Sequence, residues 1–334
     1  MQFLHCILLL SFISQTFLTN ISPERLEEIA SIINSTPNIT WYAKPPTTPF
    51  ISTSSLASTF LHKHTPHSHH PFRSFKPSHL TFPDNFNLQT HFPECESISK
   101  IYDQANCGSC WAVSAASVIS DRICIQSKQQ FKPIISSAHI ISCCKNCGLK
   151  CGGGFANAAF QFWISYGVPT GGNYGDVSTC KPYFFPPCSH FESSDIYPDC
   201  SEDDEAPLCE EKCVAEYGKD LKDDLYFGND YYYLRDQEEE IMEEIYMRGS
   251  VQASFEVYED FLIYSSGIYR YEVGDYMGGH AVKIIGWGIE KGVKYWLCVN
   301  SWNEEWGDKG MFKIKKGVDE CGIESEILGA EPKF

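Results

Sequence analysis

Residues 104–111 read Gln-Ala-Asn-Cys-Gly-Ser-Cys-Trp and place Cys107 and Cys110 on either side of a Gly-Ser pair. The residues from 110 to 125 contain neither Gly nor Pro and carry apolar side chains at helical spacing. We therefore expect a largely buried helix that begins at Cys110. A thiol in the first turn of a helix meets unpaired backbone N–H groups and the positive end of the helix dipole, which favour the thiolate. Cys110 is therefore well placed to be a nucleophile.

The Cys-x-x-Cys spacing has two other interpretations, a thioredoxin-like redox pair or half of a zinc site. The redox interpretation requires a βαβ pattern in a small cytosolic domain. The zinc interpretation requires a reducing compartment and a second close pair of ligands. Cysteines do gather at positions 143, 144, 147 and 151, but no ligand cluster with zinc-finger spacing follows them. The rest of the chain favours neither interpretation.

The N-terminus predicts export. Residues 7–13 form a largely apolar run that is typical of a secretory signal peptide and too short to span a bilayer, so we expect a signal peptide over 1–19. Because exported proteins meet an oxidising compartment, we interpret the chain's 16 cysteines as a disulfide framework. Cys6 leaves with the signal peptide, and the remaining number is odd. At least one cysteine is then unpaired, and Cys110 is the natural candidate.

Residues 20–81 differ from the rest of the chain. They contain no cysteine and many prolines, and they hold glycosylation sequons at Asn20, Asn34 and Asn38. We expect a short amphipathic helix over 23–33 and a flexible, pH-sensitive linker in the His-rich tract 62–70, although a metal site is the alternative for that tract. The segment is interpreted as a removable pro-region, followed by a mature domain over 82–334.

The composition also bears on partners. The formal net charge is −17 and the pI is about 5.0, which argues against a nucleic acid partner. Beyond the signal peptide, the sequence contains no stretch of membrane-spanning length. We therefore expect a soluble mature protein without a membrane partner.

The last third of the chain predicts a β-hairpin. Residues 281–288 and 293–299 are apolar and β-rich, and a Gly-containing loop separates them. With the turn near residue 290, His280 and Asn300 lie opposite each other, close enough for an amide to orient an imidazole. Together with Cys110 they make a nucleophile, a base and an orienting group. Gly278 and Gly279 leave room for a substrate to approach the histidine.

These residues carry a family resemblance. Gln104 together with residues 107–111 resembles the local signature of papain-like cysteine proteases, and His280 and residues 300–302 follow in the family's order. Within that family the chain is similar to the cathepsin B-like subgroup. The further matches are residues 121–124, the cysteine-rich insert 180–213, residues 277–280 and residues 321–326. The resemblance covers residues 82 to about 330, with a weaker trace at 40–41.

The resemblance implies an α+β, papain-like two-domain fold, in which a helical left domain and a β-barrel-like right domain enclose an active-site cleft with an occluding-loop insert. It implies a cysteine endopeptidase, made as a glycosylated zymogen for the lysosome or the exterior, that needs no cofactor or metal. Peptides and proteins are the expected substrates, and the chain's own pro-region and cystatin-type proteins are the expected inhibitors. The implied catalytic residues are Cys110, His280, Asn300 and Gln104. The implied substrate-binding residues are Gly108, Gly153, Gly154, His190, Ala281, Trp302 and Glu326.

Individual roles also follow from the resemblance. Gln104 and the Cys110 N–H stabilise the oxyanion, Trp302 shields the Asn300–His280 bond, and Glu326 lies at the base of the S2 pocket, which receives the second residue before the scissile bond. Six disulfides are implied: 95–124, 107–151, 143–209, 144–147, 180–213 and 188–200. Cys110, Cys298 and Cys321 are left over, and we expect Cys298 to be a buried, inert thiol.

The insert 188–200 resembles the occluding loop of the subgroup. The subgroup has two consecutive histidines there that hold a substrate's C-terminal carboxylate, whereas this chain reads His190-Phe191. Asp103 is present as the anchoring partner of the loop, and the arginine that pins its far side is missing. We therefore expect a looser loop and weakened carboxydipeptidase activity, with endopeptidase activity kept.

Two other functions remain as alternatives. A catalytically inactive cathepsin B-like binding protein is the first, but retention of Cys110, His280, Asn300 and Gln104 argues against it. A thiol–disulfide oxidoreductase that uses Cys107 and Cys110 is the second. A bond between Cys107 and Cys151 would exclude it.

Overall fold

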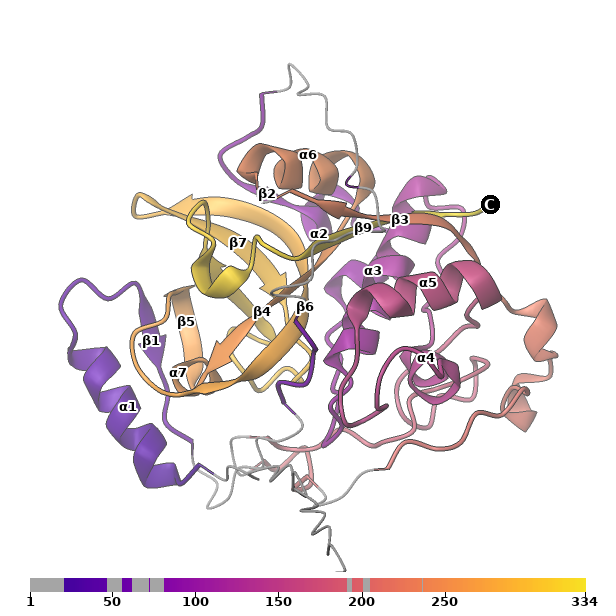
Figure 1. The fold of residues 1–334 in the computed structure, drawn as a ribbon, viewed down its shortest axis with the longest axis horizontal. Helices are drawn as coiled ribbons and strands as arrows, with labels where there is room; N and C mark the ends of the chain where they lie inside the picture. Colours follow the sequence, from indigo (N-terminus) through magenta and orange to yellow (C-terminus); the bar gives the residue numbers. More distant parts are fainter. Residues whose placement is uncertain are drawn as a thin grey trace, which may run out of the picture.

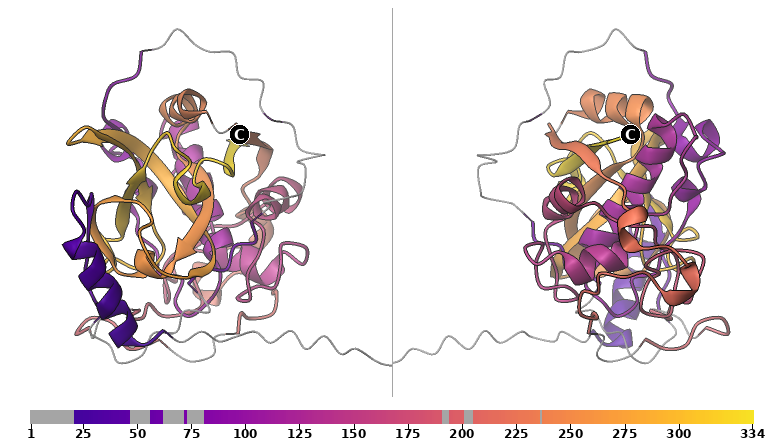
Figure 2. Two further views of the ribbon diagram at one scale, coloured as in Figure 1. Left: turned by 60° about the vertical axis from the view of Figure 1, so that its left-hand side comes forward. Right: turned by 90° about the vertical axis from the view of Figure 1, so that its right-hand side faces the viewer.

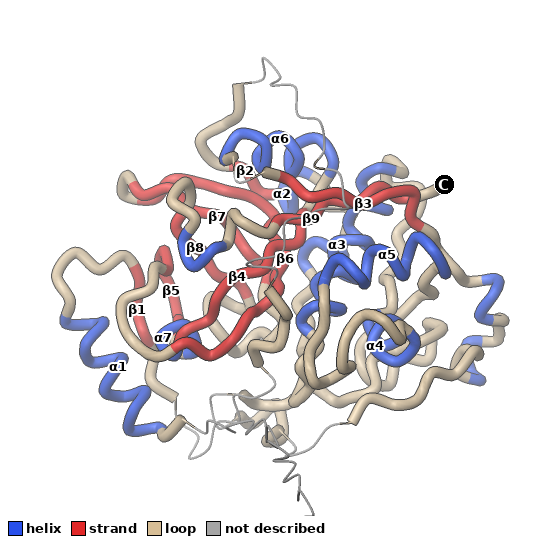
Figure 3. Tube along the Cα trace, viewed as in Figure 1, coloured by secondary structure: helices blue, strands red, loops and turns tan. Residues whose placement is uncertain are grey.

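The computed structural model describes residues 21–46, 56–61, 72, 81–190, 194–200, 205–235 and 237–334. The expected signal peptide and the His-rich tract 62–70 lie outside the described residues. Two lobes stand side by side (Figure 1), one built from helices and the other from a sheet. Figure 3 shows most of the strands gathered in one lobe, whereas the strand Gly228–Leu234 reaches across to the helices. No helix in the described part of the chain is both long and apolar enough to cross a membrane.

The helical lobe is organised around α3 (Cys110–Gln126), which lies against the sheet lobe and is accompanied by α4 (Ser137–Cys143) and α5 (Ala156–Tyr166). Every residue of α3 except the last is buried, since apolar side chains occur on all of its faces. Its serines are accommodated because they return hydrogen bonds to the preceding turn, such as Ser114 Oγ to the Cys110 carbonyl at 2.7 Å. The predicted helix is confirmed, and it begins at Cys110.

The sheet lobe holds nine strands. They are β1 (Trp41–Ala43), β2 (Phe86–Asn87), β3 (Gly228–Leu234), β4 (Val251–Tyr258), β5 (Tyr264–Tyr269), β6 (Tyr276–Glu290), β7 (Val293–Val299), β8 (Met311–Lys315) and β9 (Ile327–Pro332). The order is β1-β5-β8-β7-β6-β4-β9-β3, and β2 pairs with β6. Only the β5–β8 pair is parallel within this described sheet. The ladder does not close on itself, so the expected barrel-like lobe is a curved, open sheet.

Residues 21–46 pack on the outside of the sheet lobe. Helix α1 (Pro23–Ser35) begins at Ser22, whose side chain accepts a hydrogen bond from the Arg25 N–H, and it buries one apolar face. It lies beside β1 at the edge of the sheet lobe (Figures 1 and 2). Arg25 forms an ion pair with Glu259 at 3.2 Å, and Trp41 Nε1 donates to the Arg270 carbonyl at 3.0 Å. The segment is therefore docked through polar as well as apolar contacts.

The remaining helices are short or lie on the rim of the sheet. They are α2 (Leu88–His91), α6 (Glu238–Arg248), α7 (Glu259–Leu262) and the 3₁₀ turns Glu96–Ser99, Ala215–Tyr217, Leu221–Asp223 and Glu320–Gly322. Helix α6 covers the end of the sheet near β2 and β3 (Figure 1). Glu238, Glu239 and Glu240 in its first turn and Arg248 in its last turn complement the helix dipole.

Two buried ion pairs join the lobes. Arg122 of α3 is fully buried and contacts Glu244 of α6 at 2.9 Å, and Lys283 of β6 contacts Asp121 of α3 at 3.0 Å. Arg122 also donates to the Ala330 carbonyl of β9 at 2.7 Å. Removing one partner of such a buried pair typically costs about 3–5 kcal/mol. These contacts hold α3, and Cys110 with it, at a fixed place against the sheet.

All six predicted disulfides are formed, and the free cysteines among the described residues are Cys110, Cys298 and Cys321. Cys107 is bonded to Cys151, so the Cys107–Cys110 redox pair does not exist in this fold. Cys143, Cys144 and Cys147 are bonded as well, and therefore they are not zinc thiolates. Both alternative interpretations of the cysteine motif are thereby excluded.

Candidate active site

Cys110 lies at the first position of α3 and is fully buried. Burial raises the pKa of its thiol. The His280 imidazole opposes this effect by its charge and a hydrogen bond, helped by the Thr59 hydroxyl and the Ala281 N–H, and the resulting pKa is about 7. Thr59 Oγ1 lies 3.2 Å from Cys110 Sγ. The thiolate is thus accessible near neutral pH, as a nucleophilic cysteine requires.

His280 is held by Asn300, as predicted, but not through the predicted strand register. His280 Nε2 lies 2.7 Å from Asn300 Oδ1. The β6–β7 hairpin turns at Lys291 and Gly292, where Glu290 pairs with Val293, and its ladder ends at Lys283↔Val299. His280 and Asn300 are therefore not opposite each other. The cross-strand partner of His280 is Phe255 on β4. The side chains of His280 and Asn300 meet beyond the end of the hairpin ladder.

Aromatic rings surround the His280–Asn300 bond. The Trp302 ring lies 4.8 Å from the His280 ring, and the Phe255 ring lies 5.9 Å away in an edge-on arrangement. His280 and Trp302 are both fully buried, and Asn300 is 2% exposed. A hydrogen bond in such a water-poor site is strengthened by the low local dielectric. The arrangement fixes the orientation of the imidazole toward Cys110.

Gln104 is fully buried and firmly held. Ser301 Oγ donates to Gln104 Oε1 at 2.6 Å, and Gln104 Nε2 donates to the Cys107 carbonyl at 3.1 Å. The Gln104 N–H donates to the Ser301 carbonyl at 2.9 Å, so two parts of the chain 197 positions apart are joined beside Cys110. A fixed amide donor of this kind suits the stabilisation of a developing oxyanion.

Tyr183 supports the loop that precedes α3. Its hydroxyl lies 2.9 Å from Ser109 Oγ and donates to the Gln104 carbonyl at 2.9 Å. The sequence alone did not single out Tyr183 or Ser301. The position of Ser301 directly after Asn300 could have identified it as a site residue. Tyr183 lies in a loop that carries no motif.

Residues 56–61 lie in the cleft between the lobes. The Thr59 N–H donates to the Gly279 carbonyl at 2.8 Å, the Phe60 N–H donates to the Gly154 carbonyl at 3.0 Å, and the Gly154 N–H donates to the Ser58 carbonyl at 3.1 Å. An extended chain is therefore paired with one edge from each lobe, directly over Cys110. The place of Thr59 was not predicted, because no local feature of its sequence distinguishes it.

The glycines around this segment explain its close approach. A Cβ on Gly279 would come within 2.3 Å of the Thr59 carbonyl oxygen, and one on Gly108 would come within 2.5 Å of Ser58 Oγ. Gly153 has a φ of +107°, which other residues rarely adopt. Gly108, Gly153 and Gly154 therefore lie against residues 58–60, and Ala281 lies beside Cys110 on β6.

His190 lies on the segment that the Cys188–Cys200 disulfide closes. His190 Nε2 is 2.7 Å from Asp103 Oδ1, which matches the predicted anchor. Burial raises the pKa of Asp103, but the charge and hydrogen bond of His190 and two backbone N–H groups hold it below its usual range. At the far side Ser194 Oγ donates to Glu305 Oε1 at 2.6 Å, at a place where the sequence predicted no anchor. Phe191 lies outside the described residues.

Glu326 lines a cavity of about 590 Å³ next to the cleft, together with Ser254, Glu256 and Leu61 of the cleft segment. Ser254 N donates to the Glu326 carbonyl oxygen at 3.1 Å, which places the two residues side by side. Glu326 therefore lies at a pocket, beside Ser254.

Comparison with known proteins agrees with this geometry. The family model described as papain family cysteine protease matches residues 82–330. The chain is 46% identical over 257 residues to the cathepsin B-like cysteine proteinase 6 of Caenorhabditis elegans, covering 76% of this chain and 68% of that protein. It is 37% identical over 316 residues to the cathepsin B-like cysteine proteinase 4 of the same organism, covering 93% of each.

Solved structures agree in the same way. The chain matches procathepsin B S9 from Trypanosoma congolense with a TM-score of 0.80 and 33% identity, covering 92% of this chain and 98% of that one. It also matches the proform of the ragweed pollen cysteine protease Amb a 11 with a TM-score of 0.69 and 18% identity, covering 93% and 87%. The second likeness concerns the fold alone.

Proposed function

The chain belongs to the papain family of cysteine proteases, and from this premise we propose that it is a cathepsin B-like endopeptidase with Cys110 as nucleophile. The observation that carries the proposal is the thiol of Cys110, whose pKa is lowered to about 7 beside an imidazole that Asn300 orients. A buried thiol without such partners would stay protonated. The arrangement therefore has the chemistry of an activated nucleophile rather than of a structural cysteine.

The proposed reaction has two steps. The Cys110 thiolate attacks the peptide carbonyl carbon, and a C–S bond forms while Gln104 Nε2 and the Cys110 N–H stabilise the oxyanion. The protonated His280 gives its proton to the leaving amine as the C–N bond breaks. His280 then takes a proton from water, which attacks the acyl-enzyme and releases the acid and the thiolate. Asn300 and Trp302 keep the imidazole oriented through both steps.

We further propose that the chain is made as a zymogen whose pro-region, residues 20–81, inhibits the enzyme until it is removed. Residues 58–60 support this proposal, because they take the backbone hydrogen bonds of Gly154 and Gly279 and place Thr59 against Cys110. A substrate has no access to these groups while the segment is bound. Export to a lysosome or out of the cell fits such an enzyme, as does inhibition by cystatin-type proteins.

The occluding-loop hypothesis is that segment 188–200 blocks one end of the cleft. It also holds that the carboxydipeptidase activity of the enzyme is weakened. His190 is anchored to Asp103, and no second histidine follows it. We expect endopeptidase cleavage to exceed removal of C-terminal dipeptides, measured with matched peptides that carry a free or an amidated C-terminus. Dipeptide release from the free acid that dominates over internal cleavage would contradict the hypothesis.

The test of the main proposal is cleavage of Arg-Arg and Phe-Arg amide substrates by the acid-processed protein, with and without the epoxide inhibitor E-64. We expect inhibitable cleavage of both substrates, abolished in Cys110→Ala and retained in the matched control Cys298→Ala. Cleavage of the Arg-Arg substrate would support Glu326 as the S2 acid. If the folded, processed protein cleaves neither substrate, the alternative of an inactive cathepsin B-like binding protein takes its place.

A further inference from the structure

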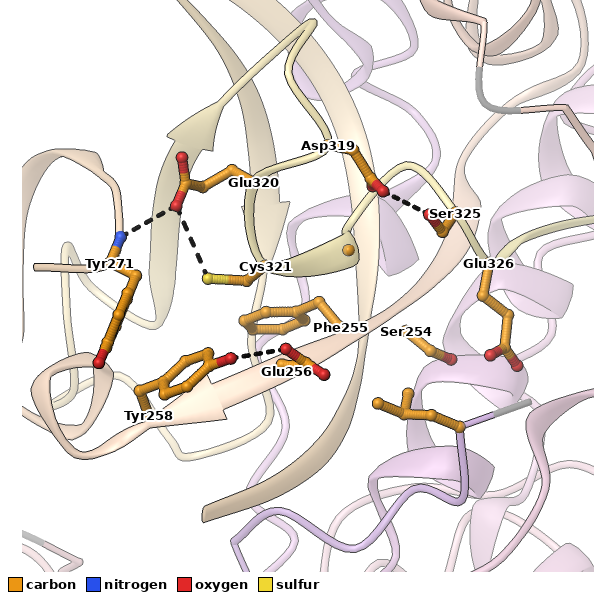
Figure 4. A pocket seen from close by; sticks show the side chains of 12 residues that line it. Ser254, Phe255, Glu256, Tyr258, Tyr271, Asp319, Glu320, Cys321, Ser325 and Glu326 are labelled. Atoms are coloured by element: carbon orange, nitrogen blue, oxygen red, sulfur yellow. Dashed lines mark hydrogen bonds between the residues drawn. The ribbon is translucent and has the colours of Figure 1, made fainter. Parts of the chain in front are cut away.

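The cavity beside the cleft has two distinct ends. It measures about 590 Å³, and Figure 4 shows Ser254 and Glu326 on one side and Tyr258 and Glu320 on the other, with the Glu256 carboxylate turned toward Tyr258. Ser254 and Glu326 are 2% and 8% exposed, so they form an inner end, whereas Glu256, Tyr258 and Glu320 are partly exposed and form an outer end. Glu326 occupies only the inner end, and the S2 assignment leaves the outer end without a function.

The inner end shows that the cavity is built for a polar ligand. The Ser254 hydroxyl is buried, lines the cavity and has no hydrogen-bond partner among the described residues. The cavity-lining side chain of the bound segment is Leu61, which cannot form a hydrogen bond. A buried hydroxyl without a partner costs free energy that a ligand with N–H donors would recover. Arginine and lysine side chains provide such donors.

The outer end carries two carboxylates that hydrogen bonds hold in place. Tyr258 donates its hydroxyl proton to Glu256 Oε2 at 2.6 Å, and the Tyr271 N–H donates to Glu320 Oε1 at 3.1 Å. Each carboxylate has about four acceptor positions, and these bonds orient the two groups. No Lys, Arg or His is among the described residues that line the cavity. The described lining therefore carries acidic side chains at both ends and no basic one.

The strand geometry relates the two ends to a bound chain. Ser254 and Glu256 are alternate residues of β4, so their side chains share one face about 7 Å apart. Glu256 is the cross-strand partner of Gly279, whose carbonyl pairs with the bound segment. Side chains two residues apart on an extended substrate also share one face at this spacing. When one substrate side chain occupies the inner end, the side chain two residues away on the same substrate can therefore reach the outer end.

We propose that Glu256 and Glu320 form a second cation subsite, which selects substrates with basic side chains at the second and fourth positions before the scissile bond. The inference rests on the proposed peptidase function and extends it from one basic residue to a spaced pair. Glu326 and Ser254 bind the nearer side chain, and Glu256 and Glu320 bind the farther one. Both contacts are charge-assisted hydrogen bonds in a partly buried site.

The test compares peptides that carry arginine or its neutral isostere citrulline at the fourth position, with arginine fixed at the second. Wild-type enzyme, processed from the full chain, is expected to show a kcat/KM about fivefold higher for arginine. Glu256→Gln should remove most of this preference, because kcat/KM for the arginine peptide falls toward the value for the citrulline peptide. The control Glu290→Gln removes the same charge from a carboxylate that bonds Lys313 outside the cavity, and it should keep the preference.

Two results would overturn the inference: equal kcat/KM values for the two peptides, or a preference that appears when arginine stands at the third position instead. Binding of both peptides to the Cys110→Ala protein, with its pro-region removed by active enzyme or by another protease, separates this inference from the proposed function. In one outcome the Cys110→Ala protein binds the arginine peptide more tightly and Glu256→Gln abolishes this difference, while the wild type cleaves neither peptide. That combination would disprove the peptidase function and support the subsite. Cleavage without discrimination in either assay would disprove the subsite alone.

Discussion

Cys110 and Cys298 are both free thiols with no exposed surface, yet their environments shift their pKa values in opposite directions. Burial raises the pKa of Cys298 well above its usual value, since β7 places that thiol among apolar side chains. At Cys110 the same burial is outweighed by His280, Thr59 and the Ala281 N–H, and the pKa is about 7. Burial alone thus makes a thiol inert, whereas burial next to an oriented imidazole activates it.

The difference depends on where the two thiols stand. Cys110 begins a helix and faces the other lobe, so side chains from β6 and from the bound segment reach it. Cys298 lies in the middle of the sheet lobe between the cross-strand partners Ile284 and Phe312, which offer no hydrogen-bonding side chain. The activated thiol is therefore a property of the interface between the lobes rather than of either lobe.

The strongest way to break this contrast is to remove the imidazole. In His280→Ala the Cys110 thiol keeps its burial but loses its main charged partner, so its pKa should rise toward that of Cys298. At pH 6 to 7 the thiolate fraction then falls, and kcat/KM should fall by a factor on the order of 10⁴. The measurements are kcat/KM and the pH dependence of alkylation by iodoacetamide in the processed enzyme.

The control for this variant is His91→Ala, which removes an exposed histidine outside the cleft and should leave both measurements unchanged. The wild-type alkylation rate should rise with pH through about 7, because the thiolate forms there. The His280→Ala rate should rise only at a higher pH. An unchanged alkylation profile would mean that the helix N-terminus, and not the imidazole, sets the reactivity of the thiol.

A smaller effect separates thiol activation from oxyanion stabilisation. Gln104→Ala leaves His280 and Asn300 in place and removes one amide donor, so kcat should fall by about 10²–10³. Alkylation of Cys110 should keep its wild-type pH profile, since Gln104 is not among the groups that lower the pKa of the thiol. If alkylation slows as much as catalysis, then Gln104 supports the geometry of the loop rather than the oxyanion.

The elements that carry these residues could be predicted where the pattern is local. The run without Gly or Pro after Cys110 gave α3, and the two apolar runs around residue 290 gave β6 and β7. The register between the two strands was wrong, because the turn lies at Lys291 and Gly292 rather than at residue 290, and hydrophobic alternation does not fix the position of a turn. His280 and Asn300 still meet, through their side chains rather than through the ladder.

Features that depend on distant segments could not be predicted. Nothing in the Pro-rich context of Thr59 indicates that it contacts Cys110, since the contact joins positions 51 residues apart. The bond of Ser194 to Glu305 likewise joins two loops 111 residues apart, in place of the arginine that the sequence lacks. The open edge of the sheet is a further example, because closure depends on strand order and not on the pattern within a strand.

The smallest expected effect concerns Thr59 and is confined to the full-length chain. Thr59→Val keeps the shape of the side chain and removes the hydroxyl that helps to lower the pKa of Cys110. A single hydrogen bond of this kind contributes about 1 kcal/mol, so the thiol pKa in the unprocessed protein should rise by less than about one unit. The pH dependence of the ultraviolet absorbance of the thiolate measures this shift.

The control is the processed enzyme, in which residue 59 is absent, so the thiol pKa should be the same with and without the substitution. A difference between the two processed enzymes would place Thr59 in a folding role instead. Together, Thr59→Val and His280→Ala would show how much of the pKa difference between Cys110 and Cys298 comes from the bound segment and how much from the sheet lobe.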